Sequence, residues 1–378
     1  MDSYERHQRF WYFIQPPIRR WMIRKFNLTY EDLHVEGPML LVPNHASAWD
    51  PLLVSASLTK KQVYYVASEH LFRLGLVSRI IAHLVSPIPR RKASTGMDTV
   101  KACLRELKAG HSVCLFAEGE QCWAGRTNPV FPATGKLVKS SGASLVTYRL
   151  EGAYLSLPRW GKGVRRGAVH GHPVGIYPPE LLKGMTPNEI NTLIERDIRE
   201  DAWERQRDDP VAYPGRHRAE GMEQAFCLCP RCRRIGTLRT RDIRIFCDCG
   251  LDLTYTETGF FLPDTPFAHP GEWDRWQTAQ LRTGNFVRPD SGPLFSDTDV
   301  TLCQIVSDHR DRVLEQGDLA LYEDRLICGS RSFPLQDISS MADVLANRLL
   351  FSFDGGYYEI RARHPVCLRK YIELWKAR

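Results

Sequence analysis

Short apolar runs alternate with helical patterns along the first half of the chain. Met39–Val42, Val63–Val66, Val113–Phe116 and Leu145–Tyr148 are apolar or β-branched, and each is bounded by Gly, Pro or polar residues. Such runs are typical of buried strands, and their alternation with helices is typical of a parallel sheet. The sequence therefore predicts an α/β fold with a mostly parallel sheet and flanking helices.

Two segments of this half carry clear helix signals. From about Gly96 to Ala109, apolar residues recur at helical spacing, and Gly110 is a suitable stop. Further along, Thr186 is placed as the N-cap of another helix, and Glu189 would complete a capping box with it. We expect a helix in each segment, and we expect the second helix to close the first domain.

The N-terminal segment has a basic amphipathic pattern. Pro16 and Pro17 are placed to open a helix in which Trp21 and Phe26 share one face, with arginines and a lysine around it. This pattern fits a helix that packs on its own domain, and it also fits a helix that docks on a membrane surface. Both interpretations hold if the helix lies at the rim of the domain.

The second half of the chain predicts a different architecture. Residues 201–220 are rich in Arg, Asp, Glu and Pro, so we expect an exposed connection there. Beyond about Gly292, strand-like runs follow one another: Leu319–Tyr322, Arg325–Cys328, Leu349–Phe353 and Tyr357–Ile360. Asp354, Gly355 and Gly356 signal a hairpin, and a final helix is expected to begin at Pro365. We predict a small β-rich module with a PH-like barrel as its architecture.

These changes along the sequence divide the chain into three parts. We predict an α/β first domain over residues 1–205 that includes the N-terminal amphipathic helix. A linker and a cysteine cluster would occupy residues 206–290, and the β-rich module residues 291–378. A length of 378 residues exceeds one ordinary compact core, which supports more than one domain.

Composition and charge limit the class of protein. Apolar residues make up 43% of the chain and charged residues 25%, as in folded globular proteins. The formal net charge of +7 suits an anionic surface such as phospholipid, and it is too small to indicate a nucleic-acid-binding protein. Because the sequence shows no bilayer-spanning apolar run and no signal-peptide pattern, we expect a cytoplasmic protein.

His45 and Asp50, in LLVPNHASAWDPLL, are the main candidates for catalysis. His45 follows a predicted strand, at the sheet edge where open α/β sheets bind ligands. On one regular helix the two side chains would lie about 140° apart. Pro51 instead fits the first turn of a helix, so that Asp50 can act as its N-cap and the loop before it can bring His45 back to the carboxylate. His45 would then take the proton of an attacking hydroxyl, whereas the alternative is a loop histidine beside a helix cap.

Two further segments carry candidate ligand contacts. Arg90, Arg91 and Lys92 are adjacent in SPIPRRKAS, and guanidinium groups match phosphate oxygens well, although such a triplet also fits a solvated turn. Glu118 and Gly119 follow another predicted strand. Glycine permits close approach of a ligand to the backbone, and the carboxylate could order an arginine or contact the substrate.

Taken together, these motifs resemble the glycerolipid acyltransferase family, which includes the lysophosphatidate acyltransferases. The hallmark of that family is a histidine, four residues and an aspartate, which NHASAWD matches. The resemblance covers about residues 10–200. It implies the glycerolipid acyltransferase fold, His45 as general base with Asp50 as its partner, and Arg90 as a phosphate-binding arginine.

The match is incomplete in the third and fourth motifs. FAEGEQ keeps the family's third motif at Phe116, Glu118 and Gly119. Gln121 stands where the family has an arginine, so either another arginine recognises the acceptor phosphate or the acceptor differs. The other basic candidates for this role are Arg91, Arg126 and Arg149. The fourth motif, LVTYRLEGAY, also diverges from the family pattern.

The resemblance implies an enzyme of phospholipid biosynthesis. It would move a fatty acyl group from acyl-CoA or acyl-carrier protein to the hydroxyl of a lysophospholipid, with lysophosphatidate as the expected acceptor, like a 1-acylglycerol-3-phosphate O-acyltransferase. Its expected place is the inner face of the membrane, with the anionic lipid surface and acyl-carrier protein as partners. The competing hypothesis is a catalytically inactive adaptor that binds lipid or nucleic acid.

The cysteines indicate a metal site in the second half of the chain. Of the 11 cysteines, five crowd into one short segment. Cys229 and Cys232 in CPRC, with Cys247 and Cys249 in CDCG, are spaced like the two knuckles of a zinc ribbon, and Cys227 is an alternative to Cys229. Four thiolates leave no open position on the ion, so the expected zinc has a structural role.

Overall fold

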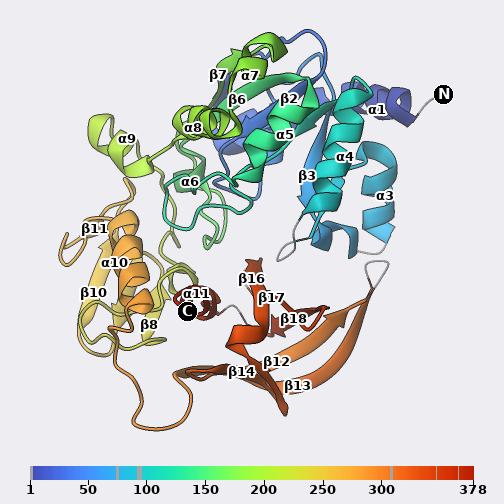
Figure 1. Cartoon of the computed structure of the whole chain (residues 1–378). Coiled ribbons are helices and arrows are strands. Elements are labelled where there is room, and N and C mark those ends of the chain that lie inside the picture. The colour runs from blue at the N-terminus through green and yellow to red at the C-terminus, as the bar shows by residue number, and fades with distance from the viewer. Residues whose placement is uncertain (1–2, 74–75, 92–95, 307–309, 346, 365) are drawn as a thin grey trace. The chain divides into compact units, whose positions relative to one another are not determined.

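The computed structural model of the chain describes residues 3–73, 76–91, 96–306, 310–345, 347–364 and 366–378 (Figure 1). Its contacts divide the chain into two compact units. Unit 1 comprises residues up to Arg90, 96–159 and 163–215, and unit 2 is formed by Arg216–Arg378 with Arg91 and Trp160–Lys162. The domain limits expected at residues 205 and 290 stay predictions.

Unit 1 is built on a seven-stranded sheet. Its strands are β1 (Leu28–Tyr30), β2 (Met39–Pro43), β3 (Val63–Ser68), β4 (Ile88–Arg90), β5 (Ser112–Cys114), β6 (Ser144–Glu151) and β7 (Val169–Tyr177). They lie in the order β1-β7-β6-β2-β5-β3-β4, and neighbouring strands are parallel except for β6 and β7. The predicted α/β class with a mostly parallel sheet is confirmed.

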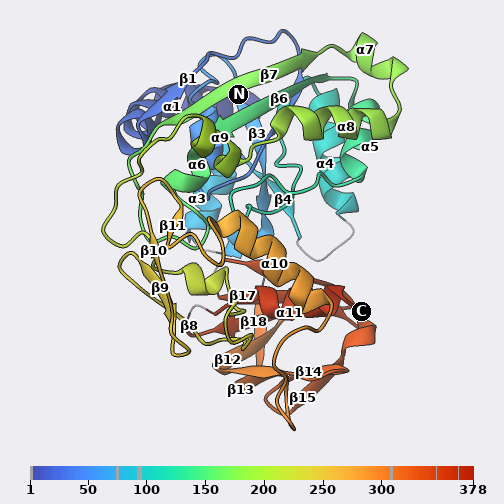
Figure 2. The same cartoon turned by 90° about the vertical axis from the view of Figure 1, so that its left-hand side faces the viewer.

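Helices cover both faces of this sheet (Figure 2). They are α1 (Ser3–Phe26), α2 (Asp50–Ser55), α3 (Leu76–Val85), α4 (Met97–Lys108), α5 (Ala133–Ser141), α6 (Ala153–Ser156), α7 (Pro179–Gly184), α8 (Pro187–Ile198), α9 (Ala202–Asp208) and the 3-10 helix Glu69–Arg73. Helix α4 ends before Gly110, whose φ is 85°. Helix α8 begins with the predicted capping box between Thr186 and Glu189. Both helices are therefore confirmed, but α9 follows α8 within unit 1, so the expectation that α8 closes the first domain is wrong.

Strand β2 lies in the centre of the sheet and is buried along its whole length. Met39 and Leu41 belong to one apolar cluster, and Leu40 and Val42 belong to another. This division follows from the alternation of side chains across a strand. A strand that is buried on both faces appears in the sequence as an unbroken apolar run, which is why it could be predicted. Its carboxyl end is therefore a rigid starting point for the loop that carries His45.

Helix α1 begins earlier than the sequence suggests. Pro16 and Pro17 lie inside the helix, so the prediction that they open it is wrong. The turns before them are attached to unit 1 because Trp11 and Gln15 are buried, and each side chain donates a hydrogen bond to a backbone carbonyl. These tertiary contacts offset the hydrogen bonds that proline cannot make. Neither α1 nor any other described helix is long and apolar enough to cross a membrane.

Residues just after 200 are less exposed than expected. Asp201 caps helix α9, where its carboxylate accepts hydrogen bonds from the backbone N–H of Trp203 at 3.0 Å and of Glu204 at 3.3 Å. The Trp203 side chain is fully buried, and its Nε1 donates to the Ala124 carbonyl at 2.8 Å. One buried tryptophan thus fixes a segment whose composition is otherwise that of an exposed connection.

Unit 2 contains two sheets. The four-stranded sheet has the order β11-β10-β9-β8 and consists of β8 (Leu238–Arg241), β9 (Arg244–Cys247), β10 (Leu251–Tyr255) and β11 (Phe261–Leu262). The seven-stranded sheet has the order β15-β14-β13-β12-β18-β17-β16 and consists of β12 (Phe295–Ile305), β13 (Asp311–Leu321), β14 (Arg325–Cys328), β15 (Arg331–Pro334), β16 (Ile338–Val344), β17 (Arg348–Phe353) and β18 (Gly356–Ala362). The helices of unit 2 are α10 (Pro270–Arg282), α11 (Arg369–Lys376) and the 3-10 helices Met222–Gln224 and Leu335–Asp337.

The larger sheet is the predicted β-rich module. The predicted hairpin joins β17 to β18 through Asp354 and Gly355, whose φ values of 46° and 67° are those of a primed two-residue turn. The final helix begins at Arg369, later than expected, while Pro365 lies outside the described residues. A seven-stranded antiparallel sheet followed by one helix suits a PH-like module, and that description stays a prediction.

Candidate active site

The loop between β2 and α2 is anchored at its first residue. The Asn44 side chain pairs with the backbone of Leu150 in β6: its Nδ2 donates to the carbonyl at 3.0 Å, and its Oδ1 accepts from the N–H at 2.7 Å. The amide group thus forms the two hydrogen bonds that a strand neighbour would form. This pair fixes the chain where it leaves the sheet, one residue before His45.

His45 and Asp50 are brought together by the loop. His45 Nδ1 lies 2.8 Å from Asp50 Oδ2. The Asp50 carboxylate accepts three further hydrogen bonds, from the N–H of Ala46 at 2.6 Å and from the N–H and hydroxyl of Ser47 at 2.9 and 2.8 Å. The imidazole stacks on the Phe116 ring, with 4.2 Å between ring centroids. The positions of both catalytic candidates are therefore fixed by several independent contacts.

The Asp50 carboxylate caps the loop and not the helix. Helix α2 has Trp49 at its N-cap without a side-chain cap bond, and proline lies in its first turn. The expectation that Asp50 acts as the N-cap is therefore not met. Because the carboxylate points back toward the loop and away from the helix N–H groups, it reaches the imidazole.

The arrangement leaves one nitrogen of the imidazole away from the carboxylate. The Asp50 side chain is fully buried, whereas 17% of the His45 side chain is exposed. A carboxylate beside Nδ1 favours the tautomer in which Nδ1 carries the proton, which leaves Nε2 as an acceptor. His45 can therefore accept a proton at Nε2 while its other nitrogen stays on the carboxylate.

Glu118 holds the backbone of the site. Its Oε1 accepts from the N–H of His45 at 2.6 Å, and its Oε2 accepts from the N–H of Asn128 at 2.6 Å. Burial raises the pKa of Glu118 well above its usual value, and the two backbone N–H groups oppose that shift. Since both oxygens bind backbone donors, the geometry gives Glu118 a positioning role, and the arginine or substrate contact considered from the sequence stays a prediction.

Replacing Glu118 by Gln tests this buried carboxyl through the pH dependence of stability. A raised pKa in the folded state means that Glu118 stabilises the fold at low pH, and that this stability is lost as pH rises through the folded-state pKa. Wild type should therefore lose thermal stability relative to Glu118→Gln as the pH rises above the usual pKa of a glutamate. Glu31 is exposed, so Glu31→Gln is the control for the loss of one carboxyl group. A difference in thermal stability between wild type and Glu118→Gln that does not change with pH would contradict the raised pKa of Glu118.

Arg90 contacts the Phe131 ring, which in turn covers Gly119 of the third motif. Its guanidinium carbon is 4.7 Å from the centroid of the Phe131 ring. The same ring covers Gly119, since a Cβ at that glycine would meet Phe131 Cε2 at 2.0 Å. Gly119 also has a φ of +75°, so both space and backbone conformation require glycine. Arg90, the ring and Gly119 thus form one stack beside Glu118.

The Arg90 guanidinium has a donor that suits an anionic ligand. Burial lowers the pKa of Arg90. Within the described part of the chain, its Nε is buried and has no hydrogen-bond partner. A buried donor without an acceptor is costly, and a phosphate oxygen is a suitable acceptor for it.

The other basic candidates are placed differently. Arg126 lies 2.6 Å from a carboxylate oxygen, and Arg149 donates to a backbone carbonyl at 2.7 Å. Arg91 is exposed and groups with unit 2, while Lys92 lies outside the described residues. Of this basic set, Arg90 is the residue that the structure places beside the third motif.

Sequence reasoning missed several residues that build the site. Asn44 and Ser47 lie inside the NHASAWD motif, so their polar side chains were available as a signal. Phe131 and Asn128 lie in an irregular segment that shows no periodic pattern, and their roles follow only from the folded chain.

Comparison with known proteins gives this geometry a family. Residues 25–151 match the family model described as Acyltransferase. Over these residues the chain is similar to the acyltransferase family. The matched segment contains both catalytic candidates, Arg90 and Glu118. The family resemblance drawn from the sequence motifs is confirmed.

The chain also matches solved structures. One of them is the crystal structure of the 1-acyl-sn-glycerophosphate (LPA) acyltransferase PlsC from Thermotoga maritima. That match has 16% sequence identity and a TM-score of 0.41, and it covers 49% of this chain and 77% of that chain. No curated protein matches the chain.

The four predicted cysteine ligands meet in unit 2. The sulfur atoms of Cys229, Cys232, Cys247 and Cys249 all lie within 4.8 Å of one another. Cys229 Sγ is 3.6 Å from Cys249 Sγ, and Cys232 Sγ is 3.9 Å from Cys247 Sγ. A tetrahedral zinc ion with bonds of about 2.3 Å requires sulfur separations of about 3.8 Å. The cluster therefore fits a four-thiolate metal ion.

Two tight turns form the cluster, and Cys227 is not part of it. The N–H of Arg233 donates to the Cys229 carbonyl at 2.9 Å, and the N–H of Gly250 donates to the Cys247 carbonyl at 2.9 Å. Arg233 and Gly250 have positive φ values of 56° and 90°, which such turns require. Cys227 is instead buried in the apolar core of unit 2. Of the two alternatives, the structure brings Cys229 into the cluster.

Proposed function

We propose that the acyltransferase domain transfers a fatty acyl group from acyl-CoA or acyl-carrier protein to the hydroxyl of a lysophospholipid. The contact between His45 and Asp50 within an acyltransferase-family domain carries this proposal. Lysophosphatidate is the acceptor that we propose, which makes the reaction that of a 1-acylglycerol-3-phosphate O-acyltransferase in phospholipid biosynthesis.

In the proposed reaction, the acceptor hydroxyl attacks the thioester carbonyl carbon while His45 Nε2 takes its proton. Asp50 stabilises the imidazolium that forms, through the 2.8 Å contact at Nδ1. The tetrahedral intermediate then collapses with cleavage of the carbon–sulfur bond, and the imidazolium returns the proton to the leaving thiolate. The products are a new ester and a free thiol on the carrier, and the histidine is neutral again.

Radiolabelled acyl thioesters and a panel of lysolipids test this function. We expect labelled diacyl product from lysophosphatidate with either acyl-CoA or acyl-carrier-protein donor, and the preferred donor identifies the co-substrate. Binding of lysolipid without product, across the whole panel, would contradict the enzyme and favour the inactive adaptor.

Arg90 is our proposed contact for the acceptor phosphate. Arg90→Gln should raise the KM for lysophosphatidate by roughly 10-fold or more, because a charge-assisted bond to phosphate is lost. The KM for monoacylglycerol, which has no phosphate, should stay unchanged. Arg207→Gln removes an exposed guanidinium from α9 and is the matched control. An unchanged KM for lysophosphatidate in Arg90→Gln would remove Arg90 from the acceptor site.

We also propose that the protein is cytoplasmic and works at the inner face of the membrane. Support comes from α1, which exposes large apolar side chains beside basic ones. Phe13 is 79% exposed, and Tyr12 and Trp21 are each 44% exposed. Lys25 Nζ lies 4.4 Å from the centroid of the Trp21 ring. Exposed aromatic and basic residues on one helix are typical of helices that lie in a membrane interface.

Zinc is the ion that we propose for the cysteine cluster. Cys229, Cys232, Cys247 and Cys249 would each supply one thiolate, with no position left for water or substrate. The ion would therefore stabilise the turns and strands of this part of unit 2, and the acyl-transfer chemistry would depend on unit 1 alone.

A further inference from the structure

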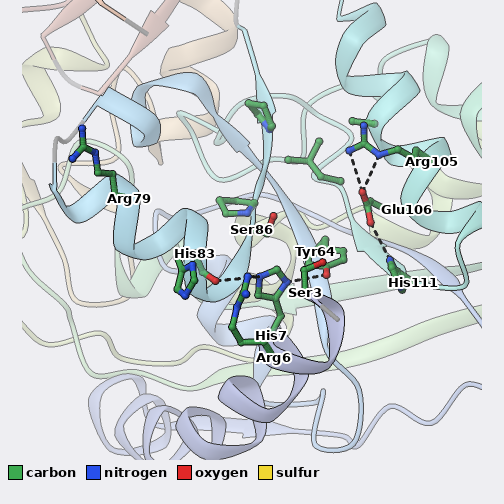
Figure 3. Close-up of a pocket in the computed structure, with 14 residues that line it drawn as sticks. Ser3, Arg6, His7, Tyr64, Arg79, His83, Ser86, Arg105, Glu106 and His111 are labelled. Atoms are coloured by element: carbon green, nitrogen blue, oxygen red, sulfur yellow. Dashed lines mark hydrogen bonds and ion pairs between the residues drawn. The ribbon is translucent and has the colours of Figure 1, made fainter. Parts of the chain in front are cut away.

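A second candidate site lies in unit 1, in a cavity of about 620 Å³ (Figure 3). Helices α1, α3 and α4 supply most of its polar side chains, and the starts of three strands complete it. The helices contribute these charged and titratable side chains to the lining: Arg6, His7, Arg79, His83, Arg105 and Glu106.

The cavity lies toward the opposite edge of the sheet from the acyl-transfer residues. Tyr64 is near the start of β3, Ser86 precedes β4, and His111 precedes β5, and all three line the cavity. His45 follows the end of β2, and Arg90 ends β4. Strands β2, β5, β3 and β4 are parallel neighbours, so their amino ends share one edge of the sheet and their carboxyl ends share the other. Ile88 and Pro89 of β4 also line the cavity and adjoin Arg90, so the cavity is separate from His45 and Asp50 but lies next to the strand that carries Arg90.

The lining of the cavity is cationic. It contains three guanidinium groups and one carboxylate, that of Glu106. Arg105 Nη2 lies 3.1 Å from Glu106 Oε1, and His111 Nδ1 lies 3.0 Å from Glu106 Oε2. The single carboxylate is thus shared between Arg105 and His111 on one wall (Figure 3). Arg6 and Arg79 come from other helices and add positive charge, which a low-dielectric cavity concentrates.

Arg6 has a donor that its neighbours do not satisfy. His7 Nε2 lies 3.1 Å from the His83 carbonyl, and His7 Nδ1 lies 3.0 Å from the Tyr64 hydroxyl. Because a carbonyl only accepts, Nε2 must carry the proton in that bond, so it cannot also accept from Arg6 Nη2, which is 3.4 Å away. Among the described residues, Arg6 Nε is also buried without a partner. The hydrogen bonds of His7 thus leave the neighbouring Arg6 guanidinium with unmet donors at the cavity wall.

We infer that this cavity binds a phosphate group. A guanidinium with unmet donors pairs best with an acceptor-only anion, and a tetrahedral phosphate can reach donors on several walls at once. Small-molecule sites span about 300–1,000 Å³, so this cavity is larger than a lone phosphate requires. The ligand is accordingly an organic phosphate, either a soluble metabolite or the head group of an anionic lipid.

Isothermal titration of the full-length protein with inorganic phosphate and with glycerol 3-phosphate, at constant ionic strength, tests this site. Arg6→Gln should weaken the binding of both by roughly 10-fold or more. Exposed Arg79→Gln, which threatens the fold less, should weaken it by a smaller factor. Arg9→Gln removes an exposed charge from the same helix outside the cavity and should leave the affinity unchanged.

Two further measurements show where the phosphate binds and whether it comes from a lipid or a soluble molecule. Binding that survives in Arg90→Gln and His45→Ala but weakens in Arg6→Gln assigns the phosphate to the cavity, whatever becomes of the proposed acyl transfer. Co-sedimentation with phosphatidylcholine vesicles, with and without phosphatidate, identifies a lipid source if the phosphatidate-dependent part requires Arg6, and a soluble source if it does not. The absence of saturable phosphate binding, or equal affinity in wild type, Arg6→Gln and Arg79→Gln, overturns the inference.

Discussion

Replacing His45 by alanine is expected to lower the rate of acyl transfer by a factor of about 10³ to 10⁴, because the general base is lost while substrate binding remains. The His45 side chain is partly exposed, and without it the Asp50 carboxylate keeps its hydrogen bonds to Ala46 and Ser47, so the fold should persist. The measurement is the steady-state rate with labelled acyl thioester and lysophosphatidate, together with a thermal unfolding curve.

Two companion variants make this result specific. His34→Ala removes an exposed histidine from the same unit and should leave the rate unchanged. Asp50→Asn keeps the size of the side chain but replaces the carboxylate that faces Nδ1, so it should also lower the rate strongly. A His45→Ala enzyme that keeps more than about one tenth of the wild-type rate would exclude His45 as the base.

The second large effect is expected in unit 2. Cys229→Ser combined with Cys247→Ser removes one thiolate from each knuckle, so the protein should lose its zinc. Binding of a structural ion contributes directly to folding, and strands β8 to β10 should become sensitive to limited proteolysis. Metal analysis of the purified protein and mapping of the cleavage sites check both expectations.

Cys227→Ala is the matched control for the zinc prediction. Cys227 lies two residues from a proposed ligand, but it packs in the core of unit 2. This variant should therefore keep its zinc while it loses some stability. An unchanged zinc content in the double variant, or loss of zinc in Cys227→Ala, would contradict the proposed ligand set.

Local patterns were sufficient for much of the fold. The run Met39–Val42 is apolar because it is buried on both sides, and Thr186 and Glu189 are neighbours on the chain as well as in the capping box. Tertiary contacts decided the cases that the patterns missed. The turns of α1 before Pro16 depend on contacts to a distant segment, and α9 depends on Trp203, whose charged neighbours hide it in any average over composition.

The candidate site was predictable where its parts are close in sequence. His45 and Asp50 are five residues apart, and Pro51 indicates where the loop after the strand ends and the helix begins. The direction of the Asp50 carboxylate could not be read from the sequence, because loop and helix offer it competing donors. The stack of Arg90 on Phe131 could not be predicted either, because it joins segments with no common pattern.

The peptide of His45 is held on both sides by one and the same loop. Glu118 binds its N–H, and the N–H of Cys122 donates to its carbonyl at 2.9 Å. Gln121, where the sequence departs from the family, lies between those two attachment points. Because both attachments belong to residues 118–122, any change in the path of this loop would carry the backbone of His45 with it.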